Sequence, residues 1–157
     1  MELVIFTGLQ AAGKSTFYRQ RFAGTHELVS KDLMQRNKGR RQAQLIEAAL
    51  SAGRSIVVDN TNPSFEERAE LIRLGRAYGA EISGYFFESP VGKSLKRNEQ
   101  RTGKARIPNI GIFATAKKLV PPSYAEGFDR LYRVRIAEGN ENTGTENFEV
   151  DEVAREE

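Results

Sequence analysis

The sequence contains no cysteine, no tryptophan and a single histidine, His26, among its 157 residues. The absence of cysteine excludes disulfide bonds, thiolate metal sites and a cysteine nucleophile. A single histidine excludes a histidine-rich metal centre and leaves little basis for a serine–histidine–aspartate triad. We therefore expect His26 to be structural, and we look for chemistry that depends on other residue types.

Long hydrophobic segments are also missing. No apolar run approaches the roughly 20 residues that a membrane-spanning helix needs. The start, Met1-Glu2-Leu3, lacks the basic flank of a signal peptide. Apolar residues make up 39% and charged residues 29%, which is typical of a water-soluble domain. We expect one cytoplasmic domain without a membrane partner, and the sequence leaves its oligomeric state open.

The charge is distributed unevenly along the chain. Of 24 basic and 21 acidic residues, eight acids and one base lie in residues 138–157, so residues 1–137 carry a net charge of +10. The acidic segment has few large apolar residues, and such a composition does not offset the entropy lost on ordering. The sequence predicts a folded domain over residues 1–137 and a disordered tail over 138–157. The basic domain indicates either a solvated surface or a polyanionic partner.

Short apolar segments alternate with helical patterns through the first 137 residues. Strands are expected at residues 2–6, 27–30, 55–58, 82–87 and 131–136. Helices are expected at residues 13–23, 40–52, 63–78, 89–101 and 110–119. Strands separated by helices predict an α/β fold with a parallel sheet covered on both faces.

Gly8-Leu9-Gln10-Ala11-Ala12-Gly13-Lys14-Ser15 matches the phosphate-loop pattern G-x-x-x-x-G-K-[ST] at every fixed position. In such a loop, backbone N–H groups surround phosphate oxygens at the positive end of the following helix. Lys14 is expected to reach the β- and γ-phosphates and the Ser15 hydroxyl to bind Mg²⁺. The predicted nucleotide-binding residues here are Gly8, Ala11, Ala12, Gly13, Lys14, Ser15 and Thr16.

Asp59 follows a predicted strand and can hold a Mg²⁺-bound water near the loop. An alternative is that Asp59 or Asn62 caps the helix that begins at Pro63. The two interpretations are compatible, with Asn62 capping the helix and Asp59 facing the nucleotide.

Phosphoryl transfer to an alcohol needs a carboxylate beside the hydroxyl and cations on the migrating group. Asp32 follows the second predicted strand, at the sheet edge where ligands bind such folds. Arg97 and Arg101 are four residues apart and lie on one face of a predicted helix, so they can point together at phosphates. A solvated helix face is the alternative for both arginines.

Several motifs together resemble the 5′-hydroxyl polynucleotide kinase family, which has animal and phage members that repair nucleic-acid ends. Besides the phosphate loop they are Ser30-Lys31-Asp32, Val58-Asp59-Asn60-Thr61-Asn62-Pro63, Arg97-Asn98 with Arg101, Ile107-Pro108, and Pro122-Ser123-Tyr124-Ala125-Glu126-Gly127-Phe128. The resemblance extends from residue 2 to 136. The Asp-Asn-Thr-Asn-Pro and Glu-Gly-Phe stretches are its most particular parts.

The resemblance implies a P-loop kinase with a five-stranded parallel sheet between helices and a small lid. It implies ATP or GTP as the phosphate donor with Mg²⁺, and Asp32 as general base toward the 5′-hydroxyl. Lys14 and Ser15 match the phosphate and Mg²⁺ contacts, and Arg101 matches the lid arginine on the transferring phosphate. Arg97 matches the preceding lid position, and Asp59-Asn60 corresponds to a polar pair that differs within the family. A phosphatase domain, which the animal and phage enzymes carry, has no room in this chain.

The leading hypothesis is a kinase that phosphorylates single-stranded RNA or DNA at a 5′-hydroxyl end. Candidate acceptor contacts are Lys31, Arg36, Arg40, Arg41 and Asn62, although the basic ones also suit an exposed helix start. The rival is a small-molecule kinase acting on a nucleoside or sugar-like alcohol. A non-catalytic nucleotide-dependent RNA-binding adaptor is disfavoured, because it needs neither Asp32 nor Arg101.

Overall fold

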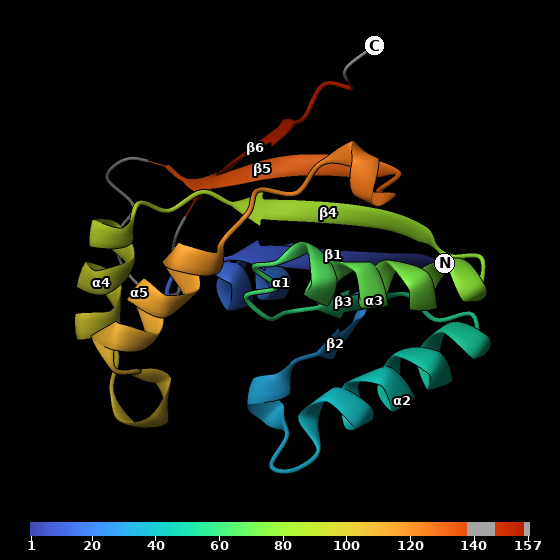
Figure 1. Cartoon of the computed structure of the whole chain (residues 1–157), viewed down its shortest axis with the longest axis horizontal. Coiled ribbons are helices and arrows are strands. Elements are labelled where there is room, and N and C mark those ends of the chain that lie inside the picture. Colours follow the sequence, from blue (N-terminus) through green and yellow to red (C-terminus); the bar gives the residue numbers. More distant parts are fainter. Residues whose placement is uncertain (138–146, 156–157) are drawn as a thin grey trace.

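The computed structural model describes residues 1–137 and 147–155, which form one twisted sheet with helices on both faces (Figure 1). The six strands lie in the order β2-β3-β1-β4-β5-β6. Their bounds are β1 Glu2–Gly8, β2 Glu27–Val29, β3 Ile56–Val58, β4 Glu81–Phe87, β5 Arg130–Ile136 and β6 Phe148–Glu152. The five strands β1 to β5 pair in parallel, as the sequence predicts, and β6 is antiparallel to β5.

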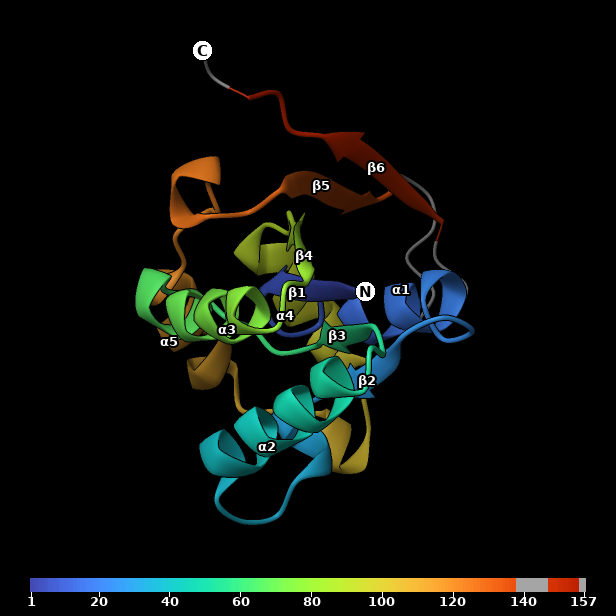
Figure 2. The same ribbon diagram turned by 90° about the vertical axis from the view of Figure 1, so that its right-hand side faces the viewer.

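Helices connect the parallel strands and cover the two faces of the sheet. Their bounds are α1 Lys14–Arg21, α2 Lys38–Ser51, α3 Phe65–Ala77, α4 Val91–Glu99 and α5 Asn109–Lys118. Three short 3₁₀ helices are η1 Lys31–Leu33, η2 Gly103–Ala105 and η3 Tyr124–Glu126. Figure 2 shows α1 on one side of the sheet and α2 and α3 on the other. The α/β class and the five predicted helices are confirmed, with ends that differ by a few residues.

Each face of the sheet has its own hydrophobic core. Alternate residues of β1 divide between them: Leu3 and Ile5 pack toward α2 and α3, and Val4 and Phe6 pack toward α1. The core under α1 is largely aromatic, and the Phe6 and Phe17 rings meet edge to face at 6.0 Å. The two cores hold β1 in place between the helices, and β1 leads directly into the phosphate loop.

The start of α3 differs from the prediction. Ser64, two residues after Asn62, is the N-cap, and its side chain forms a capping box with Glu67. Asn62 instead adopts a left-handed backbone conformation, with φ 40°, before Pro63. The sequence prediction missed this start because Pro63 suits a first helical turn, whereas Ser64 and Glu67 together satisfy more of the free backbone N–H groups.

The predicted disordered tail is wrong for residues Phe148–Glu152, which form β6. On one face of β6, Phe148 and Val150 pack against the aromatic core. On the other face, Arg135 lies 3.2 Å from Glu149 and 3.3 Å from Asp151. Composition alone misses this pairing because it does not show that the apolar and acidic residues of β6 alternate. The alternation places the acidic residues opposite the basic strand β5 and the apolar residues on the core. The other residues of the predicted tail, 138–146, 156 and 157, lie outside the described residues.

Deletion of residues 138–157 is expected to lower the melting temperature by more than about 5 °C, because it removes β6 and uncovers part of the core. Composition alone would have predicted almost no change. Differential scanning calorimetry of the truncated and full chains measures the difference, with deletion of residues 156–157 as the control. An unchanged melting temperature in the larger deletion would show that β6 contributes nothing to stability.

Among the described residues, no helix combines the length and the hydrophobicity needed to cross a bilayer. The carboxyl ends of β1 and β4 point toward the α4–α5 pair, and η1 lies on the same side of the sheet (Figure 1). This edge of the sheet brings together the motifs that the sequence predicts to be functional.

Candidate active site

The phosphate loop connects β1 to α1, in the strand–loop–helix context that its motif requires. Gly8 runs so close to β4 that a Cβ there would lie 2.9 Å from Phe87 Cβ. Ala11 and Gly13 have left-handed backbones, with φ of 58° and 93°. These conformations turn successive N–H groups to the inside of the loop, where they can bind an anion. Ala12 and Thr16 are buried beneath it.

Lys14 folds back over the loop, and only 9% of the residue is exposed. Its ammonium donates hydrogen bonds to the carbonyl oxygens of Gly8, at 2.9 Å, and Leu9, at 2.5 Å. Burial lowers the pKa of Lys14 to about 8, against the opposing effect of Asp59. The amine is thus held beside the N–H groups of the loop. The negative charge of an incoming phosphate would raise the pKa of Lys14 again and favour its charged form.

Ser15 and Asp59 meet at the start of α1. The Ser15 hydroxyl donates to the Asp59 carboxylate at 2.9 Å, and Asp59 is 6% exposed. Burial raises the pKa of Asp59, which Lys14 and the Ser15 hydrogen bond oppose. Oxygen donors of this kind suit Mg²⁺, which keeps several waters and takes few protein ligands. The predicted pair therefore fits a magnesium ion held between the protein and a bound phosphate.

Asp59→Asn is expected to raise the free Mg²⁺ concentration needed for tight nucleotide binding by about tenfold. The change keeps the shape and a hydrogen-bond acceptor for Ser15 but removes the negative charge. Calorimetric titration of ATP at a series of Mg²⁺ concentrations measures the shift, and titration without Mg²⁺ is the control. An unchanged Mg²⁺ dependence would remove Asp59 from the metal site.

Asp32 lies in η1, directly after β2. The cap of η1 is Ser30, whose hydroxyl accepts a hydrogen bond from the Asp32 N–H at 3.3 Å. The Asp32 side chain is exposed, and its charge partly opposes the burial that lowers the pKa values of Lys14 and Arg101, and adds to the burial that raises the pKa of Asp59. Its carboxylate is therefore within electrostatic range of Lys14, Asp59 and Arg101, and the cap of η1 is Ser30.

Asn60 was not predicted to be functional, yet it holds η1 in place. Its side-chain oxygen accepts from the Lys31 N–H at 2.9 Å, and its amide donates to Gln42 at 2.7 Å. Asn60 thus ties the end of β3 to both η1 and α2, next to Asp59. Its position inside the Asp-Asn-Thr-Asn run is the signal that could have identified it.

The lid consists of α4, α5 and the segment between them. Arg97 is 8% exposed and its Nε donates to the Ala11 carbonyl at 2.9 Å, which excludes a solvated helix face for this residue. Arg101 is partly buried, and burial lowers its pKa, with a further decrease from the neighbouring Arg97 charge. Arg97 therefore contacts the phosphate loop. Arg101 donates to the Ala105 carbonyl within the lid turn at 3.3 Å, and it is in electrostatic reach of Asp32 and Asp59.

Asn98 is a second residue that the sequence analysis did not single out by itself. Its buried side chain accepts from the Ile107 N–H at 3.0 Å and donates to the Ile107 carbonyl at 2.7 Å. This pair of hydrogen bonds closes the lid turn that contains Arg101. A second link joins lid and loop directly, because Gln10 donates to Thr115 of α5 at 2.8 Å.

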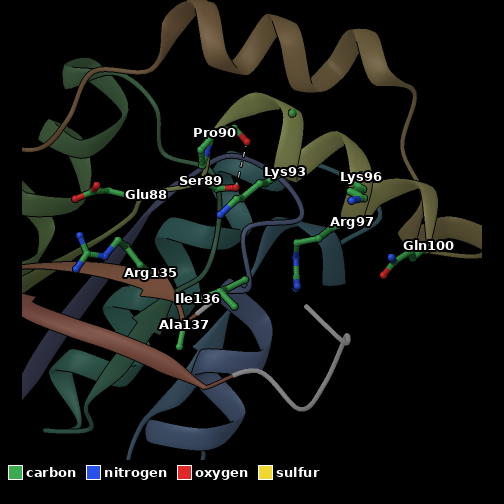
Figure 3. A pocket seen from close by; sticks show the side chains of 11 residues that line it. Glu88, Ser89, Pro90, Lys93, Lys96, Arg97, Gln100, Arg135, Ile136 and Ala137 are labelled. Carbon is green, nitrogen blue, oxygen red and sulfur yellow. Dashed lines mark hydrogen bonds between the residues drawn. The ribbon is translucent and has the colours of Figure 1, made fainter. Parts of the chain in front are cut away.

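A cavity of about 760 Å³ opens beside the loop, between α4 and the end of β5. Figure 3 shows side chains of α4 pointing across it toward Ile136 and Ala137. Its lining is Glu88, Ser89, Pro90, Gly92, Lys93, Lys96, Arg97, Gln100, Arg135, Ile136 and Ala137. Sequence reasoning missed this cavity because its walls come from segments far apart in the chain. Arg97 lines the cavity and also donates the hydrogen bond to the Ala11 carbonyl of the phosphate loop.

The predicted acceptor residues separate into two groups. Lys31 is half-buried, and Arg36, Arg40 and Arg41 are exposed around η1 and the start of α2. Asn62 is buried, and its amide donates to the Phe6 carbonyl at 2.8 Å. Its own carbonyl accepts from Arg68 at 2.9 Å. Asn62 therefore supports the strand edge, and its assignment to the acceptor is corrected.

A phosphate loop at the carboxyl edge of a parallel sheet, faced by a helical lid with arginines, defines a nucleotide-binding fold of the P-loop kinase type. The chain belongs to the AAA domain family, whose sequence profile matches residues 3–117.

Known proteins with similar sequences support the resemblance to polynucleotide kinases. The chain is 25% identical over 140 residues to the bifunctional polynucleotide phosphatase/kinase of Schizosaccharomyces pombe, covering 85% of this chain and 33% of that protein. It is 27% identical over 140 residues to transcription factor bHLH140 of Arabidopsis thaliana, covering 82% of this chain and 15% of that protein. The chain thus spans a third or less of the length of these relatives.

The structure of a fungal RNA kinase has the same fold, with a TM-score of 0.69. The two chains are 13% identical, and the match covers 87% of this chain and 76% of the other. The P-loop kinase fold and the likeness to polynucleotide kinases, both predicted from the motifs, are confirmed.

Proposed function

We propose that the protein is a kinase that uses a nucleoside triphosphate and Mg²⁺ to phosphorylate the 5′-hydroxyl end of RNA or DNA. The observation that carries the proposal is the placement of Lys14, Asp32 and Asp59 after three parallel strands, at the edge of the sheet where Arg101 of the lid is within electrostatic range of them. A binding module needs the phosphate loop alone. A base and a second cation opposite that loop are the additional parts that transfer to an alcohol requires.

The donor nucleotide would lie with its phosphates in the loop and its base in the cavity beside Arg97. Lys14 would move from the carbonyl oxygens of Gly8 and Leu9 to the β- and γ-phosphates. Ser15 and Asp59 would hold a magnesium ion, which neutralises charge on the phosphates. ATP and GTP both suit this arrangement.

The acceptor hydroxyl would lie between Asp32 and the γ-phosphate. Its oxygen forms a bond to the γ-phosphorus while the bond from that phosphorus to the β–γ bridging oxygen breaks. The Asp32 carboxylate takes the hydroxyl proton, and Arg101 stabilises the charge that spreads over the transferring group. The nucleoside diphosphate is the leaving group, so atoms and charge balance.

The basic residues around η1 favour a polynucleotide over a small alcohol. Four basic residues lie in η1 or in the segment from η1 to the first turn of α2, which also contains Asp32: Lys31, Arg36, Arg40 and Arg41. A strand that binds along such residues releases counterions, and its affinity falls steeply with salt. The sequence similarity to the polynucleotide phosphatase/kinase of Schizosaccharomyces pombe and the fold shared with a fungal RNA kinase also favour a polynucleotide acceptor.

Competition between acceptors tests this proposal. The chain is incubated with γ-labelled ATP and equal concentrations of a 5′-hydroxyl oligonucleotide, its 5′-phosphorylated form, a nucleoside and gluconate, at low and high salt. We expect label only on the 5′-hydroxyl oligonucleotide. At oligonucleotide concentrations below saturation, the rate of labelling should fall as the salt concentration rises. Preferred and salt-insensitive labelling of the nucleoside or the sugar acid would instead establish a small-molecule kinase.

A further inference from the structure

The phosphate loop is held at its beginning and middle by hydrogen bonds from side chains. Lys14 donates to the Gly8 and Leu9 carbonyls, and Arg97 donates to the Ala11 carbonyl. At the end of the loop, Gly13 is the N-cap of α1, has no side chain with which to cap the helix, and has a left-handed φ of 93°. Glycine adopts this conformation without strain but is also the residue with the most backbone freedom, so a contact from outside the loop can restrict the Gly13 end.

Phe148, the first residue of β6, contacts the loop at this end. A Cβ on Gly13 would lie 2.9 Å from Cε1 and 3.2 Å from Cζ of the Phe148 ring. The same ring meets Phe17 of α1 edge to face, with centroids 5.1 Å apart. Its strand neighbour Ile136 would lie 3.4 Å from that Cβ. The ring therefore covers the outer side of Gly13 and the first turn of α1.

The rest of β6 fixes the position of this ring. Five residues of β6 pair with β5, and Arg135 bridges Glu149 and Asp151 across the pair. Beyond the strand, the Tyr124 hydroxyl donates to the Val153 carbonyl at 2.6 Å. Figure 2 shows the start of β6 beside α1. A hydrogen-bonded strand outside the predicted kinase domain of residues 1–137 thus places the Phe148 ring against the phosphate loop.

We propose that Phe148 is a positioning residue for the phosphate loop, so that nucleotide affinity depends on the C-terminal strand. The contribution to affinity rests on the proposed function, because it requires that this loop bind a nucleoside triphosphate. The Phe148 side chain has no polar atom, so it cannot itself bind a phosphate or a metal ion. It acts by keeping Gly13 and the first turn of α1 in the conformation that directs their N–H groups inward.

Three variants separate this proposal from simple packing. Phe148→Ala removes the ring, and Phe148→Leu restores most of its apolar volume. Val150→Ala is the matched control, since Val150 lies on the same face of β6 and in the same core but two residues from the loop contact. All are measured well below their melting temperatures, so that every variant is fully folded.

Calorimetric titration with Mg²⁺–ATP is expected to give a dissociation constant about tenfold higher for Phe148→Ala than for the parent. Phe148→Leu should recover most of the affinity, and Val150→Ala should stay within about twofold of the parent. Equal dissociation constants for Phe148→Ala and Val150→Ala would overturn the proposal and leave Phe148 as an ordinary core residue.

Hydrogen exchange without nucleotide keeps the proposal testable if the parent binds no ATP. Backbone amides of residues 13–16 should exchange about tenfold faster in Phe148→Ala, and at the parent rate in Val150→Ala. Absence of nucleotide binding in the parent would contradict the proposed function alone. Unchanged exchange of these amides in Phe148→Ala would contradict the positioning by Phe148.

Discussion

Asp32→Asn is expected to slow phosphate transfer to a 5′-hydroxyl oligonucleotide at least about 100-fold, because general bases typically contribute 10²–10⁴ in rate. The asparagine keeps the shape of the side chain but cannot accept the proton of the hydroxyl. The η1 cap stays intact, since the Ser30 hydroxyl accepts the hydrogen bond from the backbone N–H of residue 32. Binding of Mg²⁺–nucleotide and of the oligonucleotide should change little.

Single-turnover transfer measures the rate, and calorimetry measures the two binding steps. Glu27→Gln is the matched control, because Glu27 is an exposed carboxylate at the opposite end of β2, paired with Arg54 at 3.4 Å. Its rate should equal that of the parent. A rate for Asp32→Asn within a few-fold of the parent would remove Asp32 from the mechanism.

Arg101→Ala is expected to lower kcat about 10³-fold, the magnitude typical of an arginine on a transferring phosphoryl group. Ground-state nucleotide binding should fall much less, since the proposed contact strengthens as charge spreads in the transition state. The change also removes the 3.3 Å hydrogen bond from Arg101 to the Ala105 carbonyl, but the lid turn should keep its shape because Asn98 still closes it through two hydrogen bonds to Ile107.

Steady-state kinetics at saturating substrates gives kcat, and ADP titration gives the ground-state affinity. Arg106→Ala is the matched control, because Arg106 is an exposed arginine in the same lid segment. Equal losses of nucleotide affinity and kcat in Arg101→Ala would identify Arg101 as a plain phosphate anchor.

The parts of the site that the sequence predicts are those encoded locally. The phosphate loop is a continuous motif between a strand and a helix, so Gly8, Gly13, Lys14 and Ser15 could be placed without long-range information. Asp32 and Asp59 could be placed because each follows a short apolar strand, and parallel strands end at the same edge.

The parts that the sequence does not predict depend on contacts between distant segments. Asn62 was predicted to cap a helix or to contact the acceptor, but its side chain is buried and donates to the Phe6 carbonyl of β1. Asn60 holds Lys31 across 29 positions, a contact that no local pattern encodes. The β6 strand was missed for the same reason, because its acidic residues pair with Arg135 of β5 and its apolar residues pack against the aromatic core.

The most direct test of the central claim follows where a labelled γ-phosphate goes. Parent and Lys14→Ala are each mixed with γ-labelled ATP, Mg²⁺ and a 5′-hydroxyl oligonucleotide, and the product is digested to single nucleotides. The proposed mechanism predicts label only on the 5′-terminal phosphate in the parent reaction, and none with Lys14→Ala, which lacks the ammonium of the phosphate loop. Parent protein that binds ATP but transfers no label to any 5′-hydroxyl end, or Lys14→Ala that transfers it at the parent rate, would contradict the mechanism.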